Sequence, residues 1–242
     1  CKARGAFRNK NNSPLVGDNV NISILENNRG VIDEIMPRLN CLIRPPVANI
    51  DRLFIVVSTI SPLPNTFVID KMIVSAEDKG IEPIIVINKS DLSSADEIAE
   101  IYKKSGFKVF VVSATNKEGV EQLYPLFKDK LSVFCGNSGV GKSSLLNAID
   151  SRFDISTADI SEKLGRGRHT TRHIELYESH DGYIADTPGF SSLDFTRLDT
   201  DYLDECILDF KPYIHSCRFS DCKHLNEPDC KIKEAVEMGL IN

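Results

Sequence analysis

Residues 136–143 have the types and the spacing of a phosphate-binding loop. They read Gly-Asn-Ser-Gly-Val-Gly-Lys-Ser and fit the pattern G-x-x-x-x-G-K-[ST] without a mismatch. The glycines let backbone N–H groups turn inward around an anion, and the helix expected next adds the positive end of its dipole. Lys142 is expected to reach the β- and γ-phosphates of a nucleotide, and the Ser143 hydroxyl to bind Mg²⁺. The predicted nucleotide contacts of this segment are Gly136, Asn137, Ser138, Gly139, Val140, Gly141, Lys142, Ser143 and Ser144.

The tetrapeptide Asn88-Lys89-Ser90-Asp91 fits Asn-Lys-x-Asp and indicates that the base is guanine. A carboxylate at Asp91 can accept hydrogen bonds from N1–H and from the N2 amino group of guanine. Adenine offers no such pair of donors, so this contact discriminates strongly between the two bases. The Lys89 stem is expected to lie along the base, and Asn88 to hold the neighbouring loops. The predicted ligand is therefore GTP or GDP.

Two further segments extend this site. Ser113 and Ala114 follow a later predicted strand, where the Ala114 N–H is expected to meet O6 of guanine. Residues 186–189 read Asp-Thr-Pro-Gly and fit Asp-x-x-Gly. Asp186 is expected to hold Mg²⁺ through a water molecule, and the Gly189 N–H to sense the γ-phosphate. Together these positions predict Mg²⁺-dependent hydrolysis of GTP to GDP and phosphate.

The residue that orients the attacking water is not the usual glutamine. Its position, directly after Asp-x-x-Gly, is Phe190, which cannot hydrogen-bond to water. His169 is the best candidate for this task, because it precedes Thr170 and Thr171, either of which could close over Mg²⁺. The alternative is that His169 contacts RNA or shapes its loop. Gly139 stands where some GTPases have a potassium-binding asparagine, so that route is not predicted.

Four residues near the end of the chain have the types of a zinc site: Cys217, Cys222, His224 and Cys230. Three thiolates and one imidazole suit a closed, tetrahedral and structural Zn²⁺ site without an open position for catalysis. Cys206 and His215 are competing ligands, and buried cysteines with a capping histidine are the metal-free alternative. A structural metal is reasonable because so short a segment buries little core of its own.

An alternation of apolar strands and amphipathic helices carries these motifs. The continuous apolar run at 53–57 is typical of a buried parallel strand. The helix predicted at 67–79 ends before Gly80, a common stop. Further strands are predicted at 83–87, 109–112, 131–135, 173–177 and 183–185, and further helices at 94–104, 118–127 and 144–149. This order predicts a doubly wound, mostly parallel α/β sheet with helices on both faces.

The order of the motifs is unusual for a GTPase. Asn-Lys-x-Asp normally follows Asp-x-x-Gly, whereas here it precedes the phosphate-binding loop. The same sheet can form if the chain enters it at a different strand, so the arrangement is predicted to be circularly permuted. The loop after Gly189 then runs directly into the C-terminal segment, so that the nucleotide state could reposition that segment.

Smaller units flank the predicted GTPase domain. Residues 20–25 alternate apolar and polar, 27–30 read as a turn and 31–35 resume, which indicates a small antiparallel barrel with the OB fold as the leading interpretation. Arg44-Pro45-Pro46 reads as a linker, and short helical patterns occur around 202–210 and 231–238. The predicted architecture is multidomain: an incomplete N-terminal OB-like β-barrel (1–50), a central α/β circularly permuted GTPase domain (51–196) and a small α-rich zinc-binding domain (197–242).

Composition limits the classes that remain. The net charge of −6 argues against a general nucleic-acid binder, but residues 1–50 carry an excess of positive charge and residues 163–173 hold a run of basic and histidine side chains. Such local patches suit a defined RNA surface. No apolar run approaches the roughly 18 residues of a membrane span and no export signal opens the chain. We expect a monomer in the reducing cytosol, where clustered cysteines bind metal.

Taken together, the chain resembles the ribosome small-subunit-dependent GTPase A family (RsgA, also called YjeQ). The resemblance rests on the permuted order, on the Cys/His spacing and on the segments 3–5, 14–18, 47–51, 136–144 and 165–171. It implies a bacterial cytosolic GTPase that binds the small ribosomal subunit late in its assembly and is stimulated by it, with an OB fold on rRNA and one zinc ion. Relative to that family, the first barrel strand is expected to be missing before Cys1 and the chain to stop inside a final helix.

Two other functions remain open. The chain could be an RNA-binding assembly platform in which hydrolysis is incidental. It could also be a permuted GTPase that acts on another RNA, such as tRNA or the large subunit. Turnover with and without each subunit distinguishes these possibilities.

Overall fold

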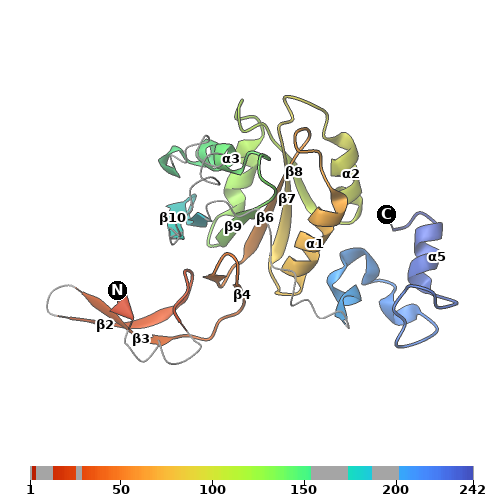
Figure 1. The fold of residues 1–242 in the computed structure, drawn as a ribbon, viewed down its shortest axis with the longest axis horizontal. Coiled ribbons are helices and arrows are strands. Elements are labelled where there is room, and N and C mark those ends of the chain that lie inside the picture. The colour runs from red at the N-terminus through yellow and green to blue at the C-terminus, as the bar shows by residue number, and fades with distance from the viewer. Residues whose placement is uncertain (1, 4–12, 26–28, 154–173, 187–201, 242) are drawn as a thin grey trace, which may run out of the picture.

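A six-stranded sheet forms the centre of the computed structural model, which describes residues 2–3, 13–25, 29–153, 174–186 and 202–241 (Figure 1). The strand order is β10-β11-β9-β6-β7-β8, and every neighbouring pair is parallel except β10–β11. The strands are β6 (Arg52–Ser58), β7 (Glu82–Asn88), β8 (Lys108–Val111), β9 (Leu131–Cys135), β10 (Glu175–Ser179) and β11 (Gly182–Asp186). The predicted doubly wound, mostly parallel sheet is therefore confirmed.

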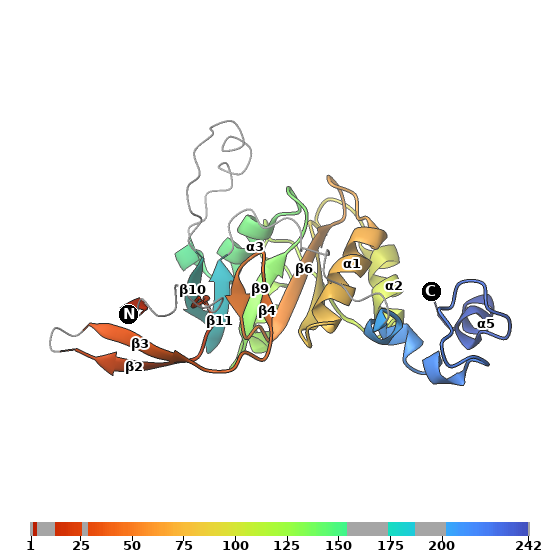
Figure 2. The same cartoon turned by 60° about the horizontal axis from the view of Figure 1, so that its bottom comes forward.

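Helices cover both faces of this sheet (Figure 2). On one face α1 (Thr66–Glu77) and α2 (Asp96–Lys104) pack against the sheet, and on the other α3 (Lys142–Ile149) and the 3₁₀ helix η2 (Val120–Leu126) do so. Helix α1 begins where the Asn65 side chain accepts a hydrogen bond from the Val68 N–H, a common N-terminal cap. Strands β6 and β7 lie between the two layers, which explains their continuous apolar sequences.

Two predicted helices differ in kind from the expectation. The segment predicted at 118–127 is the 3₁₀ helix η2, because Pro125 lies inside it and cannot donate the N–H that an α-helix needs. The pattern around 202–210 forms two separate turns, η6 (Asp204–Cys206) and η7 (Leu208–Phe210), with extended Ile207 between them. They are followed by η8 (Ile214–Ser216) and by α5 (Lys231–Glu237), which agrees with the helix predicted at 231–238.

The N-terminal residues form a second, smaller sheet. Its order is β1 (Lys2–Ala3), β3 (Gly30–Ile35), β2 (Val20–Ile24), with β2 and β3 antiparallel as predicted and β1 parallel to β3. Among the described residues this sheet is open, as part of a barrel would be. It extends from one end of the central domain, and the C-terminal segment lies at the opposite end (Figures 1 and 2).

A short hairpin joins the small sheet to the central domain. It pairs β4 (Cys41–Leu42) with β5 (Val47–Ala48), and its turn contains the residues 44–46 that were interpreted as a linker. That interpretation is wrong, because Val47 and Ile50 are buried in the same apolar cluster as Leu131 of β9. Gly17 adds to this junction: with φ at +89°, a Cβ there would lie 2.1 Å from the carbonyl oxygen of Ala48.

Within the described ranges, no helix has the length and apolar composition needed to cross a bilayer.

A matched pair of isoleucines tests whether the residues that leave this hairpin toward β6 belong to the central core. Ile50 is 2% exposed and Ile43, in the hairpin turn, is 47% exposed. We expect Ile50→Ala to lower the free energy of unfolding by about 2–5 kcal/mol, because it leaves a cavity in the core. Ile43→Ala should change it by about 0.5 kcal/mol or less. Urea unfolding followed by circular dichroism measures both, and equal effects would contradict the assignment.

Candidate nucleotide and metal sites

The phosphate-binding loop connects β9 to α3 at the carboxyl edge of the sheet. There β9 and its neighbour β6 lead to helices on opposite faces, which is the switch point where α/β proteins bind ligands. Gly141, just before α3, has φ +93°, and a Cβ on it would lie 2.4 Å from Nδ2 of Asn88. Any larger residue at this position would displace Asn88.

Lys142 begins α3 and turns back over the loop. Its Nζ donates hydrogen bonds to the carbonyl oxygens of Gly136 (2.6 Å) and Asn137 (3.0 Å). Burial lowers the pKa of Lys142, while the neighbouring Cys135 opposes that effect. The cation is thus held among the loop's backbone groups, where the N–H donors expected to bind phosphate also lie.

The buried side chain of Asn88 links three predicted segments. Asn88 ends β7 and is 2% exposed. Its Nδ2 donates to the carbonyl oxygen of Val140 in the phosphate loop (3.0 Å), and its Oδ1 accepts from the N–H of Ala114 (3.0 Å). The N–H expected to meet O6 of guanine therefore already has an acceptor, and a contact with the base would be shared with Asn88.

The side chains of Lys89 and Asp91 are also held by hydrogen bonds. The Nζ of Lys89 donates to the carbonyl oxygens of Gly139 and Ser61, both at 2.7 Å, and so bridges the phosphate loop and the loop after β6. Oδ1 of Asp91 accepts from the buried hydroxyl of Ser113 at 2.6 Å. Ser113 thus fixes the orientation of the carboxylate predicted to read guanine.

Thr59 supports the Asn-Lys-x-Asp segment, a role that the sequence alone did not indicate. It follows β6, and its hydroxyl donates to the carbonyl oxygen of Lys89 (2.7 Å) while its N–H donates to that of Asn88 (3.1 Å). Lys89 has φ +66°, a backbone conformation that needs such support outside glycine. One sequence feature could have indicated this role: the polar pair Ser58 and Thr59 comes directly at the end of an otherwise apolar strand.

The remaining predicted catalytic residues are only partly described. Asp186 is the last residue of β11, which runs parallel to β9, so its backbone lies at the same edge of the sheet as the phosphate loop. His169, Thr170, Thr171 and Gly189 lie outside the described residues.

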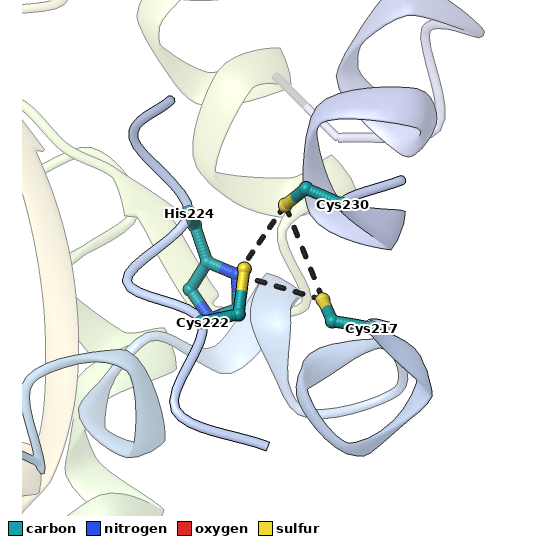
Figure 3. Close-up of side chains that lie close together, drawn as sticks. All are labelled: Cys217, Cys222, His224 and Cys230. Carbon is teal, nitrogen blue, oxygen red and sulfur yellow. Dashed lines mark hydrogen bonds between the residues drawn. The ribbon is translucent and has the colours of Figure 1, made fainter. Parts of the chain in front are cut away.

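The four predicted metal ligands converge between η8 and α5 (Figure 3). The ligand atoms of Cys217, Cys222, His224 and Cys230 all lie within 4.8 Å of one another. Nδ1 of His224 is 3.4 Å from Sγ of Cys230 and 3.7 Å from Sγ of Cys217, and the latter two sulfurs are 4.0 Å apart. A tetrahedron with Zn–S bonds of about 2.3 Å has edges of about 3.8 Å, so the donor set fits zinc.

Electrostatics at Cys230 favour metal binding. Burial alone would raise the pKa of this thiol, but backbone N–H groups of Lys233 and Ile232 and the His224 side chain bring it to about 7. The thiolate is the form that binds a metal. Among the described residues the cluster contains these four ligands, and the competing candidates Cys206 and His215 are not part of it.

The sheet order, a phosphate loop after β9 and an Asn-Lys-x-Asp segment beginning at the end of β7 define a circularly permuted GTPase. The family model for the RsgA GTPase matches residues 35–196, and that for the RsgA N-terminal domain matches residues 1–32. The chain belongs to the RsgA GTPase family. The resemblance inferred from the sequence and the predicted hydrolysis of GTP are thereby confirmed, and the family implies Mg²⁺ with GTP.

Relatives and solved structures agree with this assignment. The small ribosomal subunit biogenesis GTPase RsgA 2 of Oceanobacillus iheyensis is 46% identical over 243 residues, which cover 98% of this chain and 83% of that protein. The crystal structure of YloQ, described as a circularly permuted GTPase, matches with a TM-score of 0.82 at 38% identity, covering 100% of this chain and 80% of YloQ. The crystal structure of YjeQ from Thermotoga maritima matches with a TM-score of 0.83 at 38% identity, covering 100% of this chain and 84% of YjeQ.

Replacing Thr59 tests whether its hydroxyl supports the nucleotide site. Thr59→Val has nearly the same shape but cannot donate to Lys89, so we expect GDP affinity to fall about 5-fold, the worth of one net hydrogen bond. Thr59→Ser keeps the hydroxyl and should bind as the parent does. Titration with a fluorescent GDP analogue measures both. Equal dissociation constants for the valine variant and the parent would refute the role.

Proposed function

We propose that this chain acts in the biogenesis of the small ribosomal subunit, as a GTPase that binds the subunit and its rRNA late in maturation and is stimulated by it. The observation that supports this most directly is the similarity, over nearly the whole chain, to relatives that carry that name. The contacts of Asn88 and Lys89 with the phosphate loop support a working nucleotide site.

The nucleotide is bound by residues from both sides of the switch point. Asp91 reads the guanine edge, with Ser113 holding its carboxylate. Residues 136–144 wrap the phosphates, and Lys142 leaves the loop carbonyls to neutralise them. Ser143 and Asp186 hold the Mg²⁺ that accompanies GTP. The full set of proposed nucleotide contacts is the one given above for residues 88–91, 113–114 and 136–144.

Hydrolysis depends on the residues predicted to contact the γ-phosphate and the attacking water. Thr170 or Thr171 completes the Mg²⁺ site, the Gly189 N–H senses the γ-phosphate, and His169 orients the water. With Phe190 in place of glutamine, intrinsic turnover is slow, and His169 or the subunit supplies the missing group.

The flanking units give this enzyme its partner contacts. We divide the chain into an RNA-facing β unit (1–50), whose last residues pack into the central core, the GTPase domain (51–196) and a unit held by one structural Zn²⁺ (197–242). We place it as a monomer in the cytoplasm. A Zn²⁺ held by Cys217, Cys222, His224 and Cys230 would be structural, because these four donors would leave no open position for catalysis.

Subunit-dependent turnover tests this function. We expect purified small subunits to raise the GTPase rate at least about 10-fold, as partner-supplied groups do in other GTPases, and large subunits or tRNA to leave it unchanged. Phosphate release measures the rate, and pelleting with each subunit and a non-hydrolysable GTP analogue measures binding. Binding to the small subunit without stimulation would favour the platform, and stimulation by another RNA would replace the proposed partner.

His169→Ala tests the proposed water-orienting group. The variant should bind GTP and pellet with the small subunit as the parent does, but lose most of the stimulated turnover, because general acid–base groups contribute about 10²–10⁴-fold. His215→Ala, at an exposed histidine of η8 outside the zinc cluster, is the matched control and should retain it. Stimulated turnover at the parent rate in His169→Ala would assign the catalytic group to the subunit.

A further inference from the structure

The imidazole of His224 has its two nitrogens in different surroundings. Nδ1 lies among the sulfurs, 3.4 Å from Cys230 and 3.7 Å from Cys217. Nε2 lies 3.4 Å from Oδ2 of Asp204. The His224 side chain is only 6% exposed, so water does not readily replace this contact. The ring therefore presents Nδ1 to the metal position and Nε2 to a carboxylate.

This arrangement has a chemical consequence once zinc is bound. A metal bound through Nδ1 uses that nitrogen's lone pair, so the ring proton resides on Nε2. A buried N–H requires an acceptor, and ligating histidines usually donate their second N–H to a carboxylate or carbonyl that orients the ring. We propose that Asp204 is a positioning residue for the zinc site, accepting the Nε2–H of His224 and fixing its tautomer and orientation.

The place of Asp204 extends the proposal to the central domain. Asp204 begins η6, which packs against α1. In the same segment, Nζ of Lys211 lies 3.2 Å from a carboxylate oxygen of Glu77 in α1, and Leu208 lies beside Gly106 before β8. One carboxylate thus joins the zinc site to residues 204–211, which dock on the GTPase domain. The proposal therefore predicts a coupling between zinc binding and this docking, and any such coupling acts in both directions.

Zinc retention by the full chain tests the positioning role. The inference rests on the proposed zinc site, so metal analysis of the parent chain comes first, and an absence of zinc there would refute the site itself. In zinc-loaded protein, Asp204→Ala should release zinc to a colorimetric chelator about 10–100-fold faster, the usual effect of losing such a partner. Asp204→Asn keeps an acceptor oxygen and should stay within about 3-fold of the parent. Glu205→Ala, at the exposed neighbour, should release zinc as the parent does.

A spectroscopic readout separates positioning from general destabilisation. In the parent, the Nε2–H of His224 should give a ring ¹H–¹⁵N signal protected from exchange with water. Asp204→Ala should lose this signal to exchange, and Asp204→Asn should retain it at a shifted frequency. Asp204→Asn alone decides the matter if Asp204→Ala does not fold. Three results would each overturn the proposal. They are an unshifted ring signal in Asp204→Asn, zinc release at the parent rate in Asp204→Ala, and zinc release from Glu205→Ala as fast as from Asp204→Ala.

Discussion

The carboxamide of Asn88 is the contact on which the nucleotide edge depends. Its two ends have opposite polarity, so one side chain satisfies a carbonyl of the phosphate loop and an N–H of the loop after β8. A carboxylate could not donate to the carbonyl of Val140, and an apolar residue would leave both backbone groups buried without partners. Gly141 makes room for this amide, and Thr59 holds the turn that follows it. The segments predicted to bind the base and the phosphates are thus held together by hydrogen bonds.

The two flanking units are joined to this domain in different ways. Within the N-terminal unit, side chains tie the small sheet to the segment that enters the central domain: Arg38 makes a two-pronged contact with Asp18, and Asn49 bonds the carbonyl of Gly17 and the N–H of Leu39. The C-terminal segment docks through η6 on α1 and through the ion pair Lys211–Glu77, which is partly exposed to solvent and therefore contributes little. The junction of the first unit with the central domain is therefore buried, at Val47 and Ile50, whereas the ion pair that docks the second is partly exposed.

Much of the fold could be predicted because its signals are local. The buried strands have continuous apolar sequences, and the phosphate loop and Cys/His cluster have fixed spacings. The β4–β5 hairpin escaped prediction because strands of two residues have no measurable period. The bonds of Thr59 to Lys89 and of Asp204 to His224 join residues 30 and 20 positions apart, and only the tertiary arrangement of loops brings them together. The sequence shows which residues can do chemistry, but not which neighbours orient them.

The permuted order also determines how the sheet can assemble during synthesis. The first central strand to leave the ribosome is β6, which ends in the middle of the sheet; β7 and β8 follow on one side of it. The other edge of β6 stays unpaired until β9 is made. The Leu131 N–H at the start of β9 then donates to the Asp51 carboxylate. Until that point the nascent half-sheet has an unpaired, apolar edge and no phosphate loop, so GTP cannot stabilise it. The nucleotide can therefore stabilise this sheet only after β9 and the phosphate loop have been made, whereas in a GTPase of ordinary motif order the phosphate loop is made first.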